Sequence, residues 1–385
     1  MPGNKIPGIN IPRIRRMPGI HRIPGVQKIQ MPGLRKIPGA GERSYAYAKA
    51  CGIIGKSFIG KRIGELERAG RLSELDRMVF PVSSRDLPEK ELLLDLEKRI
   101  TNRAVDSIIS IVGNFSGVPE FLALLVRGYE YTDLKSAIMA ALNKEKNAPI
   151  YTDIGNFRTV HFDAWPDIKA MIEGTEFVYL LNKKVVDIEE EGGVSMQTLL
   201  DRRYYEMLWQ ALFSLPGKDR RAAGKILADE ISLRNSSWAL RLRTYYGMSP
   251  DRVMSHLVSI PSGRKLQSGK KIGIRTLADE ALRSLELPLD NYTAWSSWRW
   301  KEFVNPDSGA SHWTIDPRYF QNAASRYLYR LARRHFRLEP FSLDAVFCFI
   351  KLKQFEEDIL TSSAEGLSIG MSGRDVFTML GVERE

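Results

Sequence analysis

The chain contains one pattern twice, as Tyr246-Gly-Met-Ser-Pro-Asp-Arg-Val-Met-Ser-His-Leu257 and as Ile369-Gly-Met-Ser-Gly-Arg-Asp-Val-Phe-Thr-Met-Leu380. Gly247 and Gly370 suit the end of a helix, where the backbone often needs a positive φ. The serine two residues after each glycine is placed as the N-cap of a following helix, and Pro250 then occupies a first helical position. A valine and a leucine four residues apart give that helix one apolar face. Each copy therefore predicts a helix, a turn and a second helix.

A long helix is expected before each turn. These helices are predicted over residues 225–245 and 345–367, and a fainter third copy covers residues 121–142. The centre of the third copy, Arg127-Gly-Tyr-Glu-Tyr-Thr-Asp-Leu134, resembles Lys353-Gln-Phe-Glu-Glu-Asp-Ile-Leu360. A spacing of roughly 100 residues is too long for a solenoid repeat, so the recurrence indicates one helical unit used three times. The expected units are residues 44–156, 157–263 and 264–385, the last with a Trp-rich insertion.

The composition limits the class of protein. A hydrophobic content of 43% is sufficient for a real core. Cys51 and Cys348 form no CxxC pair, so we expect neither a disulfide framework nor a zinc framework, and a reducing cytosol is the default compartment. No apolar run approaches the roughly 18 residues of a membrane span, and no secretory signal is recognisable.

Positive charge is concentrated at the N-terminus. The net charge is +11, but residues 1–41 hold eight Lys and Arg and no acidic residue, which leaves 49 basic and 46 acidic residues in the body. Repeated Pro-Gly pairs in this segment oppose both helix and strand. We therefore predict a disordered basic tail over residues 1–43, serving as a spacer or as a weak adhesive for anionic lipid or nucleic acid. The nearly neutral body has no global electrostatic reason to bind phosphates.

The body is expected to be mainly α-helical. Asp86-Leu-Pro-Glu89 has the form of a capping box before an amphipathic helix that ends at Gly113, and similar helical patterns cover residues 196–215 and 320–336. Clean period-two strands are nearly absent, although residues 177–188 are ambiguous. Four tryptophans gather between residues 287 and 316, where they either cap a core or form an interface; we favour the core.

Patterns that indicate chemistry are weak. Ala50-Cys-Gly-Ile-Ile-Gly-Lys-Ser57 fits a relaxed P-loop pattern, but the residues before it are helix-like rather than a buried strand, and no acidic Walker-B strand follows. The five histidines lack metal-ligand spacing. Glu130 and Glu356 are interpreted as surface ion-pairing residues, since each has basic neighbours within a helix. We predict no catalytic, cofactor-binding or metal-binding residue, and no cofactor.

Several stretches together resemble a known family. The runs Phe349–Glu356 and Glu365–Phe377 are similar to the C-terminal helix and turn of the C subunit of V-type (archaeal and bacterial) ATPases, the counterpart of the eukaryotic d subunit. Tyr45–Lys49, Arg127–Lys135 and Leu200–Tyr205 resemble other segments of the same family, so that the likeness spans residues 44–382. The sequence departs from the family where Asp133 and Ile359 replace an Asn, and where Cys51-Gly52 replaces basic residues.

The resemblance implies three similar helical subdomains arranged as a funnel. It also implies a non-enzymatic role as a central-stalk (rotor) subunit on the cytoplasmic face of the membrane. The partners implied are the central-stalk subunits and the membrane proteolipid ring, so that membrane contact is made through other subunits and the complex transports protons or sodium. No specific nucleic acid and no small-molecule substrate are implied.

Two other classes of protein remain open from the residues alone. A basic-tailed helical nucleic-acid-binding protein would be retained on DNA in a salt-sensitive manner. A P-loop enzyme would bind nucleotide through the segment around Lys56.

Overall fold

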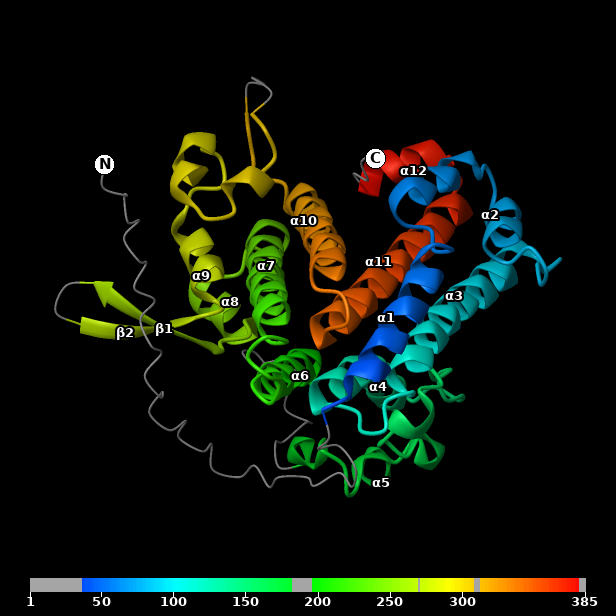
Figure 1. The fold of residues 1–385 in the computed structure, drawn as a ribbon. Helices are drawn as coiled ribbons and strands as arrows, with labels where there is room; N and C mark the ends of the chain where they lie inside the picture. Colours follow the sequence, from blue (N-terminus) through cyan, green and yellow to red (C-terminus); the bar gives the residue numbers. More distant parts are fainter. Residues whose placement is uncertain (1–36, 182–195, 269–270, 308–311, 381–385) are drawn as a thin grey trace, which may run out of the picture. The chain divides into compact units, whose positions relative to one another are not determined.

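The computed structural model describes residues 37–181, 196–268, 271–307 and 312–380, and its fold is mainly α-helical, as the sequence predicts. Figure 1 shows the order of the elements. Most of the predicted tail (residues 1–36) and Glu189–Glu191 lie outside the described residues. The helices are α1 (Ala40–Ile54), α2 (Leu72–Val79), α3 (Glu89–Val112), α4 (Glu120–Leu142), α5 (Ile168–Ile172), α6 (Met196–Leu212), α7 (Arg221–Tyr246), α8 (Pro250–His256), α9 (Asp279–Glu286), α10 (Pro317–Leu338), α11 (Leu343–Ser368) and α12 (Gly373–Leu380), with the 3-10 helix η1 at Gly60–Arg68.

One β-hairpin departs from the expectation of an almost strand-free body. Strands β1 (Pro261–Ser268) and β2 (Lys271–Thr276) pair in antiparallel register, and the register shifts between Pro261 and Lys265. Gly and Lys occur in both strands and Ser in β1, so apolar and polar residues do not alternate cleanly enough to reveal the hairpin in the sequence. Of the ambiguous residues 177–188, the described part forms a 3-10 turn at Val178–Leu180 and no strand.

The three predicted long helices are α4, α7 and α11. Each ends in a residue with left-handed backbone: Lys144 at φ 54°, Gly247 at φ 59° and Gly370 at φ 83°. After α4, the amide of Glu145 donates to the carbonyl of Ala140 at 3.0 Å; after α11, the amide of Met371 donates to Gly366 at the same distance. The two predicted glycine turns are confirmed, and the first copy makes the same turn with a lysine.

The caps after these turns differ in detail. The Ser372 hydroxyl accepts a hydrogen bond from the Asp375 amide at 3.1 Å and donates to the Asp375 carboxylate, so α12 begins with a reciprocal cap. Ser249 occupies the N-cap position of α8 and Pro250 the first helical position, but the Ser249 side chain makes no capping hydrogen bond. The predicted capping box at Asp86–Glu89 is wrong: α3 begins after Pro88, and no side chain caps it. The missing cap is consistent with Pro88 at that position, because proline offers no side-chain acceptor.

The core consists of one large cluster with smaller clusters beside it. The large cluster joins α1, α3, α4, α6, α7, α10 and α11. Each long helix also packs against a cluster of its own: α4 against residues 151–180, α7 against α8, α9 and the Trp-rich segment, and α11 against η1, α2 and α3. The segment that completes the packing of α11 therefore comes from the N-terminal third of the chain. The divisions at residues 156 and 263 stay a prediction.

The tryptophan cluster belongs to the core, as favoured from the sequence. Trp295, Trp298 and Trp300 are buried, and Trp313 is half-buried. Their rings pack against one another and against Phe320 of α10. Buried indole N–H groups need acceptors, and the carbonyl oxygens of Pro288 and Glu280 accept from Trp295 and Trp298 at 2.9 and 3.0 Å. This segment holds α7, α9 and α10 together.

The shared left-handed turn can be tested by exchanging glycine for residues with a Cβ atom. A Cβ added at Gly247 or Gly370 would meet nothing within 4 Å, so only backbone conformation opposes it. We expect Gly370→Ala to lower the free energy of unfolding by about 1–2 kcal/mol, and Lys144→Gly to raise it by up to about 1 kcal/mol. Gly52→Ala, within α1 and equally unobstructed, is the control and should stabilise by roughly 0.5–1 kcal/mol. Denaturant titration measures all three, and a neutral Gly370→Ala would contradict the account.

Candidate functional site

Each long helix carries buried polar residues three positions apart. Their exposed fractions do not exceed 8% in any copy. A helix has 3.6 residues per turn, so each step of three residues rotates the side chain by about 60°, and positions i, i+3 and i+6 span about 120° of the helix surface. In α11 only the first two of these positions are polar, and the third is the apolar Ile359. The residues are Arg127, Glu130 and Asp133 in α4, Asp229, Ser232 and Asn235 in α7, and Lys353 and Glu356 in α11.

In α4 these side chains bind the irregular segment that follows the helix. The Glu130 carboxylate accepts hydrogen bonds from the amides of Thr159 and Val160, and Asp133 accepts from the Thr152 amide at 2.7 Å. Arg127 forms a buried ion pair with Glu176 at 2.8 Å. Burial raises the pKa of Glu130, and it raises the pKa of Asp133 to about 6, although the donated hydrogen bonds oppose both shifts.

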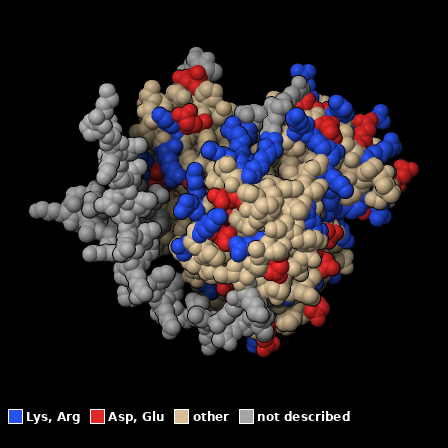
Figure 2. All heavy atoms as spheres, viewed as in Figure 1, with Lys and Arg blue, Asp and Glu red and all other residues tan. Residues whose placement is uncertain are grey.

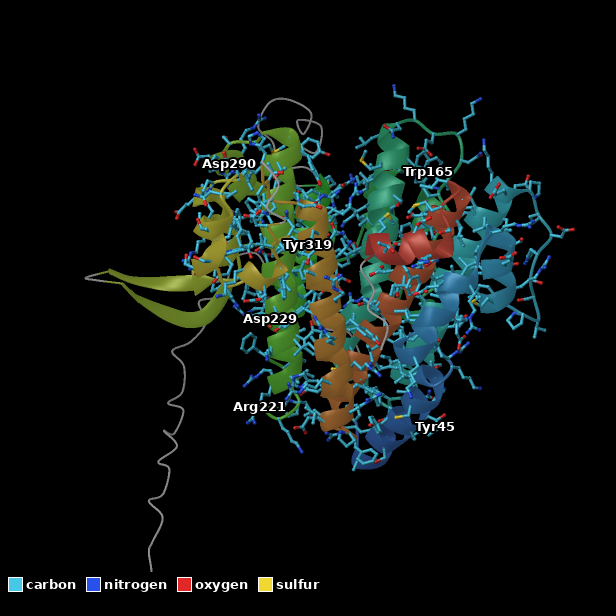
Figure 3. All side chains as sticks on the ribbon, turned by 90° about the horizontal axis from the view of Figure 1, so that it is seen from above. Tyr45, Trp165, Arg221, Asp229, Asp290 and Tyr319 are labelled. Carbon is cyan, nitrogen blue, oxygen red and sulfur yellow. The ribbon has the colours of Figure 1, made fainter. Side chains whose placement is uncertain are left out.

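In α7 the same positions hold the hairpin region and the Trp-rich segment. The Asn235 amide group accepts from the Val258 amide at 2.9 Å and donates to the Val258 carbonyl at 2.9 Å. Ser232 accepts from the indole N–H of Trp300 at 3.3 Å. Asp229, labelled in Figure 3 beside α10, accepts from Arg299 at 2.6 Å and from the Tyr327 hydroxyl at 2.7 Å. These three contacts were not foreseen from the sequence.

In α11 the polar residues reach back to the N-terminal part of the chain. Glu356 accepts a hydrogen bond from the Phe58 amide at 2.7 Å and forms a buried ion pair with Lys353. Lys353 also donates to the Ser57 hydroxyl at 3.3 Å. Burial opposes ionisation of Glu356, but the Lys353 ammonium and the Phe58 amide outweigh it and lower the pKa of the carboxyl. The carboxylate is therefore charged at neutral pH.

These contacts correct the interpretation of Glu130 and Glu356 as surface ion-pairing residues. Both side chains are buried, with exposed fractions of 1% and 2%. Both hold backbone amides of irregular segments, which need acceptors because no regular structure supplies them. The sequence contained a signal, since the polar residues recur three apart in helices that are otherwise strongly apolar.

A hollow between α10 and α11 is lined mainly by polar side chains. Its volume is about 480 Å³, and Thr101 of α3 and Leu380 of α12 close two sides. Three carboxylates of α11 face it, from Glu357, Asp358 and Glu365, and Arg326 lies on the α10 side. The hollow is therefore predominantly acidic, and it is bordered by helices from both ends of the chain.

Two carboxylates of this hollow, those of Glu357 and Asp358, have a raised pKa. The Tyr129 hydroxyl donates to Glu357 at 2.7 Å, while burial raises the pKa of that carboxyl. Asp358 is an exposed residue, yet desolvation of its carboxylate within the hollow raises its pKa to about 7, and the negative charges of Glu357 and Glu230 add to this effect. Asp358 therefore changes charge near neutral pH.

The structure also places the residues of the P-loop-like pattern. Ala50 lies within α1 and Gly55 is the C-cap residue of that helix, so the pattern follows a helix where a P-loop follows a strand. The Ser57 hydroxyl donates to the Ile53 carbonyl at 3.1 Å and accepts from Lys353.

The described part of the chain offers neither a metal site nor a membrane span. Within residues 37–181, 196–268, 271–307 and 312–380, no group of three or more His, Cys, Asp and Glu side chains is arranged to hold a metal ion. No helix of those ranges combines the length and the apolar character needed to cross a membrane.

Comparison with known proteins gives a family and a relative. The sequence profile described as ATP synthase (C/AC39) subunit matches residues 85–375. A protein of Treponema pallidum (strain Nichols), named only as an uncharacterized protein, is 27% identical over 326 residues, which cover 85% of this chain and 92% of that protein. The relative is thus similar over nearly its whole length.

The role of the buried carboxylate in α11 is tested by Glu356→Ala. This change leaves the Lys353 ammonium buried without its partner and the Phe58 amide without its acceptor. We expect a loss of about 3–5 kcal/mol in the free energy of unfolding. The control is Glu365→Ala, an exposed residue of the same helix, which should change it by less than about 0.5 kcal/mol. Equal effects of the two variants in urea unfolding would refute the assignment.

The raised pKa of Asp358 predicts a pH-dependent effect of Asp358→Asn. An acid whose folded-state pKa is raised weakens the fold above that pKa, and the cost disappears as the pH falls from about 7 toward about 4. Asp358→Asn should therefore stabilise at pH 8 by up to about 1 kcal/mol, since solvent screens an exposed group, and should be neutral near pH 4. Thermal melts at the two pH values measure this effect. Asp106→Asn, at an exposed position of α3 outside the hollow, is the control; a gain independent of pH would contradict the assignment.

Proposed function

Because the chain belongs to the ATP synthase (C/AC39) subunit family, we propose that it is a non-catalytic central-stalk subunit of a V-type rotary ATPase. In this role it joins the soluble stalk to the membrane proteolipid ring, and the complex transports protons or sodium. The observation that carries the proposal is the family match over residues 85–375. The chain then acts at the cytoplasmic face of the membrane through its partner subunits.

The internal structure supports a mechanical role. A rotor component must transmit force without yielding, so its segments must be fixed to one another by many contacts. The buried polar residues of α4, α7 and α11 fix loops to helices in this manner. Asparagine and carboxylate contacts of this kind are directional, whereas apolar packing alone is not.

The acidic hollow supports a proposal for one contact. A partner segment with exposed Lys or Arg side chains would find complementary charge at Glu357, Asp358 and Glu365. We assign this hollow to the soluble stalk, because α11 and α10 border it and α11 is tied both to the N-terminal segment at Phe58 and to α7 at Ala223. The arrangement of three units as a funnel stays a prediction.

The proposal is tested by purifying a tagged full-length chain from detergent-solubilised membranes. Stalk, catalytic and proteolipid subunits of one V-type ATPase should accompany it. Purification of the chain alone, or with nucleic acid and no ATPase subunit, would refute the proposed function.

A second measurement tests coupling. Phe355→Pro interrupts α11 at a cost of roughly 3 kcal/mol or more, and it breaks the ring stacking with Tyr329, whose centroid lies 4.2 Å away. Membranes carrying this variant should lose ATP-driven ion pumping while the catalytic head still hydrolyses ATP. Phe355→Leu, which preserves the helix, should retain pumping. Full pumping with Phe355→Pro would contradict the coupling role.

A further inference from the structure

A second surface of the chain combines exposed cations with exposed apolar side chains. We call it the basic face. It lies where the N-terminal ends of α1, α7 and α11 meet the C-terminal end of α10. Figure 2 shows Lys and Arg gathered over α10 and its surroundings, and Figure 3 shows Arg221 and Tyr45 along one edge. Its exposed cations are Lys218, Arg221, Lys225, Arg334 and Arg337, and its exposed apolar residues are Tyr45, Phe213, Leu338 and Phe341.

Side-chain and backbone contacts join these elements into one surface. Tyr47 of α1 packs against Phe341 and Phe336 with ring centroids 5.2 Å away in each case. Lys225 of α7 and Arg334 of α10 both lower the pKa of His335, after the larger effect of burial, so the two cations lie near the same ring. The Asp344 carboxylate at the start of α11 accepts hydrogen bonds from the amides of Ala222 and Ala223.

The buried acidic groups of this region are used inside the protein. Asp219 accepts from the Leu343 amide at 3.0 Å and pairs with Arg43, and its exposed fraction is 3%. The buried Asp344 carboxylate likewise accepts a hydrogen bond from the Ala222 amide at the start of α7. Among the described residues, none of the five exposed cations of the basic face forms an ion pair. The surface therefore presents a net positive charge, because its five exposed cations outnumber the half-buried Glu42 of α1 and Glu339.

The apolar residue Phe341 is held outward by a constrained turn. Its backbone is left-handed, with φ 61°, a conformation that a bulky residue rarely adopts. Ser342 fixes the turn by accepting from the Ala345 amide at 3.0 Å and by donating to the Glu339 carbonyl. The side chain of Phe341 is 53% exposed and that of Leu338 57% exposed. A strained position that exposes an aromatic ring is a recurrent property of functional sites.

We propose that the basic face binds the anionic surface of a phospholipid bilayer directly. Arg and Lys would contact lipid phosphates, which guanidinium groups bind in a bidentate manner. Phe341 and Leu338 would enter the boundary between headgroups and acyl chains, as apolar residues flanked by cations do at membrane interfaces. Exposed apolar side chains beside cations suit the boundary between headgroups and acyl chains, and the chain belongs to the ATP synthase (C/AC39) subunit family; both favour lipid over nucleic acid.

The proposal is independent of the proposed function, because it concerns the purified chain alone. Full-length protein is sedimented with vesicles of phosphatidylcholine, either pure or with about a third of phosphatidylglycerol, at about 0.15 M salt, where exposed charges are screened beyond about 8 Å. We expect binding to the anionic vesicles only. Each cation near such a surface contributes about fivefold in partitioning, so Arg334→Glu with Arg337→Glu should reduce it at least about 25-fold.

Two further variants distinguish binding through the basic face from attraction due to the total charge of the protein. Arg318→Glu changes an exposed arginine at the opposite end of α10, and its binding should stay within about twofold of wild type. Phe341→Gly removes the ring, and glycine suits the observed φ. Relief of the strained φ offsets the lost contact with Tyr47, so the fold should persist with a melting temperature close to that of wild type, while partitioning falls several-fold. The basic tail is identical in all variants, so its contribution to vesicle binding cancels when the partitioning of a variant is divided by that of the wild type.

Three results would overturn the inference. The first is the absence of wild-type binding to anionic vesicles. The second is equal losses for Arg318→Glu and for the Arg334→Glu, Arg337→Glu pair, which would indicate non-specific attraction. The third is salt-sensitive binding to double-stranded DNA with no vesicle binding, which would assign the face to nucleic acid. Copurification with ATPase subunits is a separate result, so the two proposals can fail independently.

Discussion

A backbone amide buried outside regular structure must find an acceptor, and this constraint organises the chain. Irregular segments lie against all three long helices, and their amides cannot be satisfied by a strand or a helix of their own. The long helices supply the acceptors: Glu130 for Thr159 and Val160, Asn235 for Val258, and Glu356 for Phe58. One solution therefore recurs in all three long helices.

Such contacts specify structure more than they add to stability. Burying the Glu356 carboxylate and the Lys353 ammonium costs desolvation free energy, which cancels much of the free energy gained from their attraction. The buried ion pair is therefore weak evidence for a net gain in stability. A wrongly placed segment, however, would leave the same groups buried and unpaired, which costs several kcal/mol, on the order of 3–5. The polar residues therefore select one partner segment for each helix, while the apolar cores around them drive collapse.

Much of the fold could be predicted from local chemistry. Glycine in a left-handed turn and a proline at a first helical position are visible in the sequence, and Gly247, Gly370 and Pro250 fulfil those roles. Lys144 makes the same turn without a glycine, so this turn was not predicted. The buried state of Glu130 and Glu356 was missed, because a carboxylate beside a basic residue is equally consistent with a surface and with a core. The signal for burial is the recurrence of polar residues three apart in helices that are otherwise apolar. The hollow between α10 and α11 joins residues far apart in sequence, and no local pattern predicts it.

The attachment of α11 to the N-terminal helices has a consequence for biosynthesis. The Phe58 amide and the Glu356 carboxylate are separated by 298 residues, and the apolar face of α3, with Leu92, Leu96 and Ile100, is covered in part by α11. The chain leaves the ribosome from its N-terminus, so this face emerges long before its cover. At about 5–20 residues per second, the interval between the end of α3 and the start of α11 is roughly ten to fifty seconds. During that time the apolar face of the nascent α3 lacks part of its cover, and the native N-terminal core is completed only when translation is nearly finished.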